Sequence, residues 1–290
     1  MKKVIISTET TCDLPREYIE KNGIRVVNML YTLDGEDFGG KTGRELDGHA
    51  FFERMREGGK TQTAQVTPAE AKEHFSALLQ EGDVLHVAFS GALSGTAHNF
   101  ALAAEELNAE GGEHKVVVVD SRGASLGEGL LVHLVNKKAE QGASLEELAA
   151  YTAELRDHIC HFFVVDDLNF LYRGGRVSRT AAILGTMLKI KPVLHVDPQG
   201  RLIPIQKVMT RKKSLQRLVE WMEEKYVPQE TDVFISHGDC PEEAQYVADL
   251  VEKKMGLKTQ IIHSLGPVIG AHSGPGTVAL FFYGKDKIAK

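Results

Sequence analysis

The chain has 290 residues, of which 42% are hydrophobic and 26% charged, and its formal net charge at pH 7 is −6. This length suits one large or two medium-sized domains, and the interspersed charges exclude the strongly basic surface of a nucleic-acid-binding protein. No stretch approaches the ~20 apolar residues that span a bilayer, so we expect no transmembrane segment and at most transient membrane contact. Three widely spaced cysteines argue against a disulfide framework and favour a cytoplasmic protein.

Strand and helix patterns alternate through the first half of the chain. Strands are expected over residues 2–7, 23–33, 83–89 and 115–119, and helices over residues 15–21, 45–57, 68–80, 97–107, 127–141 and 144–157. Thr67 and Ser144 are the expected N-caps of two of these helices. The βαβ rhythm predicts an N-terminal α/β domain, residues 1–160, in which helices cover both faces of a mostly parallel sheet.

The pattern changes after residue 160. Strands are expected over residues 162–165, 190–196, 201–208, 232–236, 258–262 and 277–283, and helices over residues 178–188, 213–225 and 241–255. Pro198-Gln199-Gly200 is a hairpin turn signal, which predicts antiparallel pairing of the strands on either side. We therefore expect a two-lobed α/β protein whose second lobe, residues 161–290, is an α+β domain with a mixed or antiparallel sheet.

The segment Ser90–Thr96 reads Ser-Gly-Ala-Leu-Ser-Gly-Thr and joins an expected buried strand to an expected helix. A loop of glycine and hydroxyl residues at a helix N-terminus can direct backbone N–H groups and hydroxyls toward an anion. Because the loop holds no charged residue, the pattern favours a carboxylate or phosphate held by neutral donors. A capped turn that binds nothing is the alternative at this point.

Three other polar segments contain candidate ligand-binding residues. Thr63 and Gln65 lie in a polar loop and have no capping role. Ser121 follows a parallel strand, at the edge where open α/β sheets place their sites. His272 lies in a tight, glycine-rich bend, where an imidazole can donate to a carboxylate or carry a proton.

Two further patterns are discounted. Gly35–Thr42 matches the phosphate-loop pattern G-x-x-x-x-G-K-T, but Glu36 and Asp37 would place negative charges around the phosphates, and Asp34-Gly35 favours a hairpin turn. His158–His161 and His237–Cys240 contain metal-ligand types without a second half at zinc-site spacing. We interpret them as surface or strand-end histidines, with His161 opening a strand, and expect no metal.

Ser94 and His272 also admit an enzymatic interpretation as nucleophile and base of a serine hydrolase or acyltransferase. Ser94 does not lie in a G-x-S-x-G elbow, and the sequence marks no third, orienting residue. The hydrolase is therefore the competing hypothesis. A binder of another carboxylate or of a phosphate ester is a third.

Taken together, several segments resemble the DegV family, the bacterial fatty-acid-binding proteins also called FakB. The segments, with the family motifs that they resemble, are Thr8–Leu14 (T-D-S-T-C-D-L), Thr63–Gln65 (T-S-Q), Ser90–Thr96 (S-G-x-L-S-G-T), Asp120–Gly127 (D-S-x-x-A-S-x-G), Tyr172–Pro192 (K-G-G-R-I…L-G…I-K-P) and His272–Gly276 (H-T-G-P-G). The matches run from residue 4 to residue 280, which is nearly the whole chain.

The resemblance implies a long-chain fatty acid buried in the fold, with its carboxylate held by Thr63, Ser94 and His272 and with Gly95 and Thr96 beside them. It also implies a partner, the ATP-binding subunit of a fatty-acid kinase. That subunit would phosphorylate the bound carboxylate to an acyl phosphate for phospholipid synthesis. This chain would then be a carrier rather than an enzyme, with no cofactor other than the bound lipid.

The resemblance adds further candidates and shows departures. Arg173, Arg176 and Arg211 join Gln65 and Ser121 as candidates for ligand or partner contacts. Glu9 replaces the usual aspartate of the opening motif, and Met209 stands where an arginine is common. If that arginine contributes to carboxylate binding or kinase docking, the substrate or partner of this chain differs from the family pattern.

Overall fold

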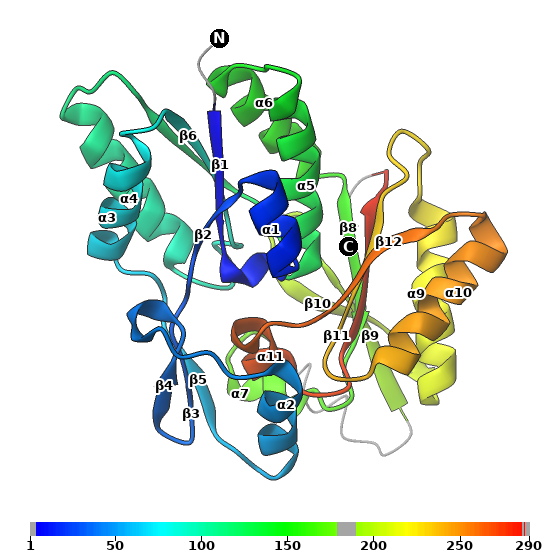
Figure 1. Cartoon of the computed structure of the whole chain (residues 1–290). Helices are drawn as coiled ribbons and strands as arrows, with labels where there is room; N and C mark the ends of the chain where they lie inside the picture. The colour runs from blue at the N-terminus through cyan, green and yellow to red at the C-terminus, as the bar shows by residue number, and fades with distance from the viewer. Residues whose placement is uncertain (1–3, 179–189, 286, 288–290) are drawn as a thin grey trace.

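The computed structural model describes residues 4–178, 190–285 and 287, which form three sheets with helices between and around them (Figure 1). The first sheet is parallel, with the order β2-β1-β6-β7. Its strands are β1 (Val4–Glu9), β2 (Arg25–Val27), β6 (Asp83–Ala88) and β7 (Val116–Asp120). The predicted mostly parallel sheet of the first half is confirmed.

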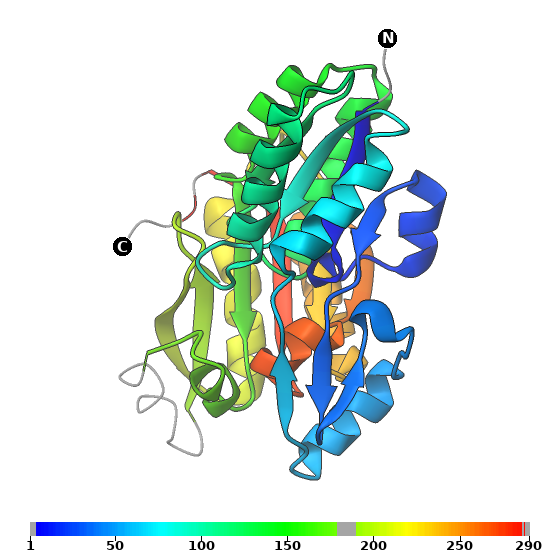
Figure 2. The ribbon, with the colours of Figure 1, turned by 90° about the vertical axis from the view of Figure 1, so that its left-hand side faces the viewer.

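Helices cover both faces of this parallel sheet, as its apolar strands require (Figures 1 and 2). The helices on one face are α3 (Pro68–Leu78) and α4 (Thr96–Ala109), and those on the other are α5 (Leu126–Glu140) and α6 (Leu145–Leu155), with the short α1 (Arg16–Asn22) at the edge. The predicted caps are confirmed. The side chains of Thr67 and Ser144 accept hydrogen bonds from the amides of Glu70 and Glu147, which return the bond in two capping boxes.

The second sheet has the order β10-β9-β8-β13-β11-β12, and all its neighbours are antiparallel except β11 and β12. Its strands are β8 (Ile159–Val164), β9 (Ile190–Val196), β10 (Leu202–Met209), β11 (Val233–His237), β12 (Thr259–Ser264) and β13 (Val278–Tyr283). Helices α9 (Arg211–Lys225) and α10 (Pro241–Met255) pack against it. The predicted mixed sheet and the predicted β9–β10 hairpin are confirmed.

Helix α5 lies between the two large sheets and contacts strands of both. One apolar core continues from Ile6 and Leu85 of the parallel sheet, through Leu130 of this helix, to Phe163 and Phe281 of the second sheet. The second sheet begins at β8, close to the expected boundary at residue 160. The division into two domains stays a prediction, since the core is continuous across that boundary.

A third, small sheet differs from the sequence expectation. It has the order β4-β3-β5, and its strands are β3 (Tyr31–Leu33), β4 (Glu36–Phe38) and β5 (Thr61–Thr63). The single strand expected over residues 23–33 is therefore two strands in different sheets. Between them the Met29 amide donates to the Thr10 side chain instead of to a neighbouring strand. Helix α2 (Gly48–Arg56) packs against this sheet, and the 3-10 helix η2 (Gly40–Thr42) follows β4. The 3-10 helix η1 (Thr10–Cys12) follows β1 and contacts α5.

The phosphate-loop match is a hairpin. Asp34 and Gly35 have positive φ angles of 54° and 82°, and Leu33 pairs with Glu36 across the turn. The matched segment thus continues into strand β4, so its amides do not wrap around a central anion. The interpretation of this segment as a chance match is confirmed.

Two short helices were not predicted, namely α7 (Asn169–Arg173) and α11 (Pro267–Ser273). The glycine-rich segment over residues 269–277, which holds His272, was expected to be a bend. That prediction is wrong for His272 itself, which lies in the helix that Pro267 begins. It is confirmed for the turn that follows, where Gly274 and Gly276 have positive φ angles of 80° and 76°. The helix expected over residues 178–188, together with Leu184 and Gly185, lies outside the described residues but for Ser178. Within the described residues, no helix combines the length and the apolar character needed to cross a membrane.

Candidate functional site

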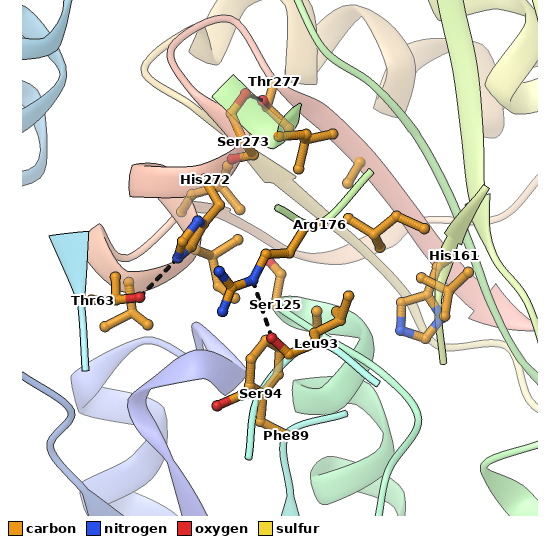
Figure 3. A pocket seen from close by; sticks show the side chains of 18 of the residues that line it. Thr63, Phe89, Leu93, Ser94, Ser125, His161, Arg176, His272, Ser273 and Thr277 are labelled. Carbon is orange, nitrogen blue, oxygen red and sulfur yellow. Dashed lines mark hydrogen bonds between the residues drawn. The ribbon is translucent and has the colours of Figure 1, made fainter. Parts of the chain in front are cut away.

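A cavity of about 270 Å³ lies where the three sheets approach one another. Its walls are mainly apolar, and its polar lining residues include Thr63, Gln65, Ser94, Ser125, His161, Arg176, His272, Ser273 and Thr277. Among the described residues, no aspartate or glutamate lines it. The predicted residues Thr63, Ser94 and His272, which are far apart in the sequence, therefore meet around one cavity (Figure 3).

Thr63 lies on a strand rather than in the polar loop that the sequence suggested. Strand β5 is held by its pairing with β3, in which Tyr31 faces Thr63. This pairing fixes the Thr63 side chain, whose Oγ1 lies 2.8 Å from Nε2 of His272. A hydroxyl and an imidazole from distant parts of the chain thus form a hydrogen-bonded pair at the cavity wall (Figure 3).

His272 occupies the last turn of α11. Its second ring nitrogen, Nδ1, is buried and has no hydrogen-bond partner among the described residues. Gly174 makes room for this ring, because a Cβ atom there would lie 2.3 Å from Nδ1. Burial, together with the nearby charge of Arg176, lowers the pKa of His272 to about 4, so the imidazole is neutral at pH 7.

Most backbone amides of the loop Ser90–Thr96 donate hydrogen bonds within the loop. The amides of Leu93 and Ser94 donate to the Ser90 carbonyl, that of Ala92 donates to the Ser90 hydroxyl, and that of Thr96 donates to the Ser94 hydroxyl. The expectation of several unpaired amides directed at one anion is therefore not met. The loop instead presents the Ser94 hydroxyl to the cavity, where it lies 2.9 Å from the Thr96 hydroxyl.

The residues around Ser94 are arranged to hold it. Thr96 is fully buried, accepts a hydrogen bond from the Val66 amide and does not line the cavity, so it positions Ser94. Gly95 lines the cavity, and a Cβ atom there would lie 2.2 Å from Oε1 of Gln65. Gln65 and Gly95 are both exposed, so this end of the cavity lies at the molecular surface.

Arg176 supplies the cationic group of the cavity. Its Nε donates to the Leu93 carbonyl at 3.1 Å, and its Nη1 donates to the Gly174 carbonyl, so the guanidinium links the Ser94 loop to the turn beside His272. Among the described residues, no carboxylate pairs with Arg176, and burial lowers its pKa. An uncompensated, half-buried guanidinium beside hydroxyl groups suits an anionic ligand.

The other predicted contact residues lie outside the cavity. Ser121 is buried, and its hydroxyl exchanges hydrogen bonds with the backbone of Gly123. Arg173 is exposed and lies over the Phe170 ring at 4.7 Å. Arg211 forms an ion pair with Glu243 at 2.6 Å.

The two departures from the family pattern have different surroundings. Glu9 is fully buried, and its Oε2 accepts a hydrogen bond from the amide of Phe89. Because Phe89 directly precedes the loop Ser90–Thr96, Glu9 holds the start of that loop in place. Met209 is 53% exposed at the end of β10 and does not line the cavity. The missing arginine therefore removes no group from the cavity wall.

Four polar lining residues were missed as site residues, namely Ser125, His161, Ser273 and Thr277. Ser125, with a positive φ of 56°, donates to the Ser236 hydroxyl at 3.0 Å. His161 lies inside β8 and is only 3% exposed, so its interpretation as a strand-opening or surface histidine is wrong. The period-two spacing of His161 and Phe163, which both line the cavity, could have indicated a shared inward face.

A possible metal-ligand group lies elsewhere on the surface. His49, Glu53 and Asp239 bring ligand atoms close together, but the Arg56 guanidinium already pairs with Asp239 at 2.5 Å. Arg56 also pairs with Glu53. The Arg56 guanidinium thus already provides the positive charge that balances these two carboxylates.

The nucleophile–base interpretation finds little geometric support. In the described part of the chain, Ser94 pairs with Thr96 and no hydrogen bond joins it to His272. His272 Nδ1, which an orienting acid would hold in a catalytic triad, has no partner there. The arrangement is therefore better suited to holding a ligand than to attacking one.

Comparison with known proteins finds a matching family model and relatives of the same family. The family model described as "Uncharacterised protein, DegV family" matches residues 3–285. A DegV domain-containing protein of Clostridium perfringens is 38% identical over 289 residues, which cover 99% of both chains.

Solved structures of this family have the same fold. A DegV family protein from Thermus thermophilus, described as binding fatty acid, is 29% identical, with 98% of this chain and 100% of that chain covered and a TM-score of 0.85. A fatty-acid-binding DegV family protein from Streptococcus agalactiae is 28% identical, with 99% and 100% covered and a TM-score of 0.86. This chain therefore belongs to the DegV family.

Proposed function

We propose that this chain binds a long-chain fatty acid in the cavity, with the carboxylate beside Thr63, Ser94, Arg176 and His272. The observation that carries the proposal is the Arg176 guanidinium, which has no carboxylate partner among the described residues and lies beside these neutral donors at one end of an otherwise apolar cavity. The carboxylate supplies the counter-charge that the described residues do not. The fatty acids bound by the two related proteins support the same ligand class.

The two parts of such a ligand have different energetic roles. Burial of each CH₂ group of the chain contributes about 0.8 kcal/mol, so the apolar walls provide most of the affinity. Burial of the carboxylate costs several kcal/mol unless charged or polar donors compensate it. Ser94, Thr63 and Arg176 provide that compensation and fix the orientation of the ligand.

Native mass spectrometry of the purified protein, followed by lipid extraction, tests this proposal. We expect a co-purified long-chain fatty acid, and saturable binding of a labelled fatty acid after delipidation. Methyl esters of the same acids have no carboxylate charge and should bind much more weakly. A protein that is empty and also fails to bind free fatty acids would contradict the proposal.

The proposed function includes a second step, in which the chain presents the bound carboxylate to a separate kinase subunit. In that reaction a carboxylate oxygen attacks the γ-phosphorus of ATP, and the products are an acyl phosphate and ADP. Two observations support this role. The cavity end with Gln65 and Gly95 lies at the surface, and the exposed Tyr172 and Arg173 stand on α7, in the turn that leads to Arg176. These exposed side chains are candidates for kinase docking.

Reconstitution with a fatty-acid kinase subunit and ATP tests the presentation step. Acyl phosphate, trapped with hydroxylamine, should form only when protein, fatty acid and kinase are all present. The Arg173→Glu variant should reduce acyl phosphate formation without changing fatty-acid affinity. Equal rates for this variant and the wild type would exclude Arg173 from docking.

Labelling with a fluorophosphonate tests the competing hydrolase hypothesis. We expect no covalent adduct at Ser94, because no described base contacts its hydroxyl. An adduct at Ser94 that is lost in Ser94→Ala would favour the enzyme.

A further inference from the structure

The cavity has a second polar position, His161, on the side away from Thr63 and His272. In Figure 3 the Arg176 guanidinium lies between His272 and the His161 ring. His161 pairs with Phe281 across β8 and β13, and Phe163 pairs with Ala279. All four residues line the cavity, so His161 is the polar member of an otherwise apolar group on this sheet face.

The hydrogen bond of His161 Nδ1 determines whether the other ring nitrogen, Nε2, is a donor or an acceptor. Nδ1 lies 2.9 Å from the Ile159 carbonyl oxygen, and because a carbonyl only accepts, Nδ1 carries the proton. Burial lowers the pKa of His161 well below its ordinary value, so the ring is neutral. Nε2 is therefore a bare acceptor, and it has no hydrogen-bond partner among the described residues.

The fold makes specific room for this imidazole. A Cβ atom on Gly127 would lie 2.1 Å from Nε2, and one on Gly123 would lie 2.9 Å from it. The Phe281 ring meets His161 edge-on, with centroids 5.3 Å apart. A buried acceptor without a partner is unfavourable, and an apolar side chain would avoid that cost. The ring is thus held in place with one hydrogen-bonding position unused.

We propose that this position is a subsite for a hydroxyl group on the acyl chain, so that the preferred ligands include hydroxy fatty acids whose hydroxyl is remote from the carboxylate. This inference rests on the proposed fatty-acid-binding function and names a substrate class for the same cavity. The hydroxyl donates to Nε2 of His161, while the carboxylate stays beside Ser94 and Arg176.

Other polar substituents fit this subsite less well. An oxo group has only acceptor lone pairs and faces the lone pair of Nε2. A charged amino group would lose its hydration against Phe163 and Phe281 without a carboxylate partner among the described lining residues. A hydroxyl is neutral and supplies the single donor that Nε2 lacks.

A matched series of fatty acids of one chain length tests the inference on the wild-type protein. The series contains the unsubstituted acid, acids with the hydroxyl near the carboxyl, at mid-chain and near the methyl end, and the oxo acids at the same positions. We expect one remote hydroxy acid to bind about three- to tenfold more tightly than its oxo counterpart, the worth of one neutral hydrogen bond. Equal affinities for every hydroxy and oxo pair would overturn the inference.

Variants assign the preference to His161. The His161→Phe and His161→Leu variants should lose the preference for the hydroxy acid while they still bind the unsubstituted acid. His195→Phe is the matched control, because His195 is equally buried on the neighbouring strand β9 but does not line the cavity, and it should keep the preference. A preference that survives in both His161 variants would contradict the subsite. Failure of the unsubstituted acid to bind to wild type would instead contradict the proposed function.

Discussion

Each end of the cavity contains a neutral imidazole, half-buried in the case of His272 and buried in the case of His161, and the groups around the two rings differ. His272 bonds to the Thr63 hydroxyl and lies near the Arg176 guanidinium, at an end where exposed residues border the cavity. His161 bonds to a backbone carbonyl and lies against Phe281 in the interior. Under the proposed function, the surroundings of each histidine, more than the imidazole itself, suit one end of the cavity to a carboxylate and the other to an alkyl chain.

The largest expected effect comes from removing the charge at the surface end. Arg176→Gln should weaken fatty-acid binding by about ten- to hundredfold, because a hydrogen bond to a charged group contributes about 1.5–3 kcal/mol. A fluorescent fatty-acid displacement assay measures this. Arg173→Gln is the matched control, since that side chain is exposed and lies over Phe170, and its affinity should be unchanged. Equal losses in both variants would remove the distinction between the two arginines.

Removal of the hydroxyl groups at the same end should have the next largest effect on fatty-acid affinity. Ser94→Ala and Thr63→Val should each weaken binding by about tenfold, the effect of losing one hydrogen bond to a carboxylate. Calorimetric titration of the delipidated protein measures the affinity. Ser121→Ala removes a hydroxyl outside the cavity and should leave affinity unchanged. Wild-type affinity in Ser94→Ala would place the carboxylate elsewhere.

The close packing of Gly174 against His272 predicts that a side chain at position 174 destabilises the protein mainly while the imidazole is present. Gly174→Ala should lower the free energy of unfolding by about 1 kcal/mol, since the new Cβ would meet His272 Nδ1. Urea unfolding measures this change. In the background of His272→Ala the same substitution should cost much less, because the ring is gone. An equal cost in both backgrounds would show that His272 is not the obstacle.

The smallest expected effect is on the pH dependence of binding. The pKa of His272 is lowered to about 4 in the ligand-free protein, and a bound carboxylate raises it by favouring the charged ring. Binding then takes up protons, so affinity should rise a few-fold as the pH falls from about 7 toward 5. His272→Gln should lack this component, which titration at several pH values would reveal. Identical pH profiles would mean that the carboxylate lies away from His272.

Local patterns predicted much of this architecture because they depend on neighbouring residues. The caps at Thr67 and Ser144, the Asp34-Gly35 turn and the loop before α4 are each set by a few consecutive residues. Helix α11 was not predicted because its glycines suggested a bend, whereas Pro267 and packing against other elements hold a short helix.

The polarity of the cavity could not be predicted from these patterns. The absence of a carboxylate partner for Arg176 among the described residues depends on how the elements are arranged in three dimensions. The inward position of His161 depends on the pairing of β8 with β13, whose residues are more than a hundred positions away. The sequence brought together candidates for the carboxylate end through hydroxyl and glycine motifs. A single histidine among apolar strand residues carried no such signal.

A crystal structure with a fatty acid brominated at its methyl end would locate both ends of the ligand in the cavity. We predict a carboxylate within hydrogen-bonding distance of Ser94 Oγ and the Arg176 guanidinium, and an anomalous bromine peak beside the apolar residues around His161 and Phe281. A bromine peak beside Ser94, or a carboxylate at the His161 end, would contradict this prediction.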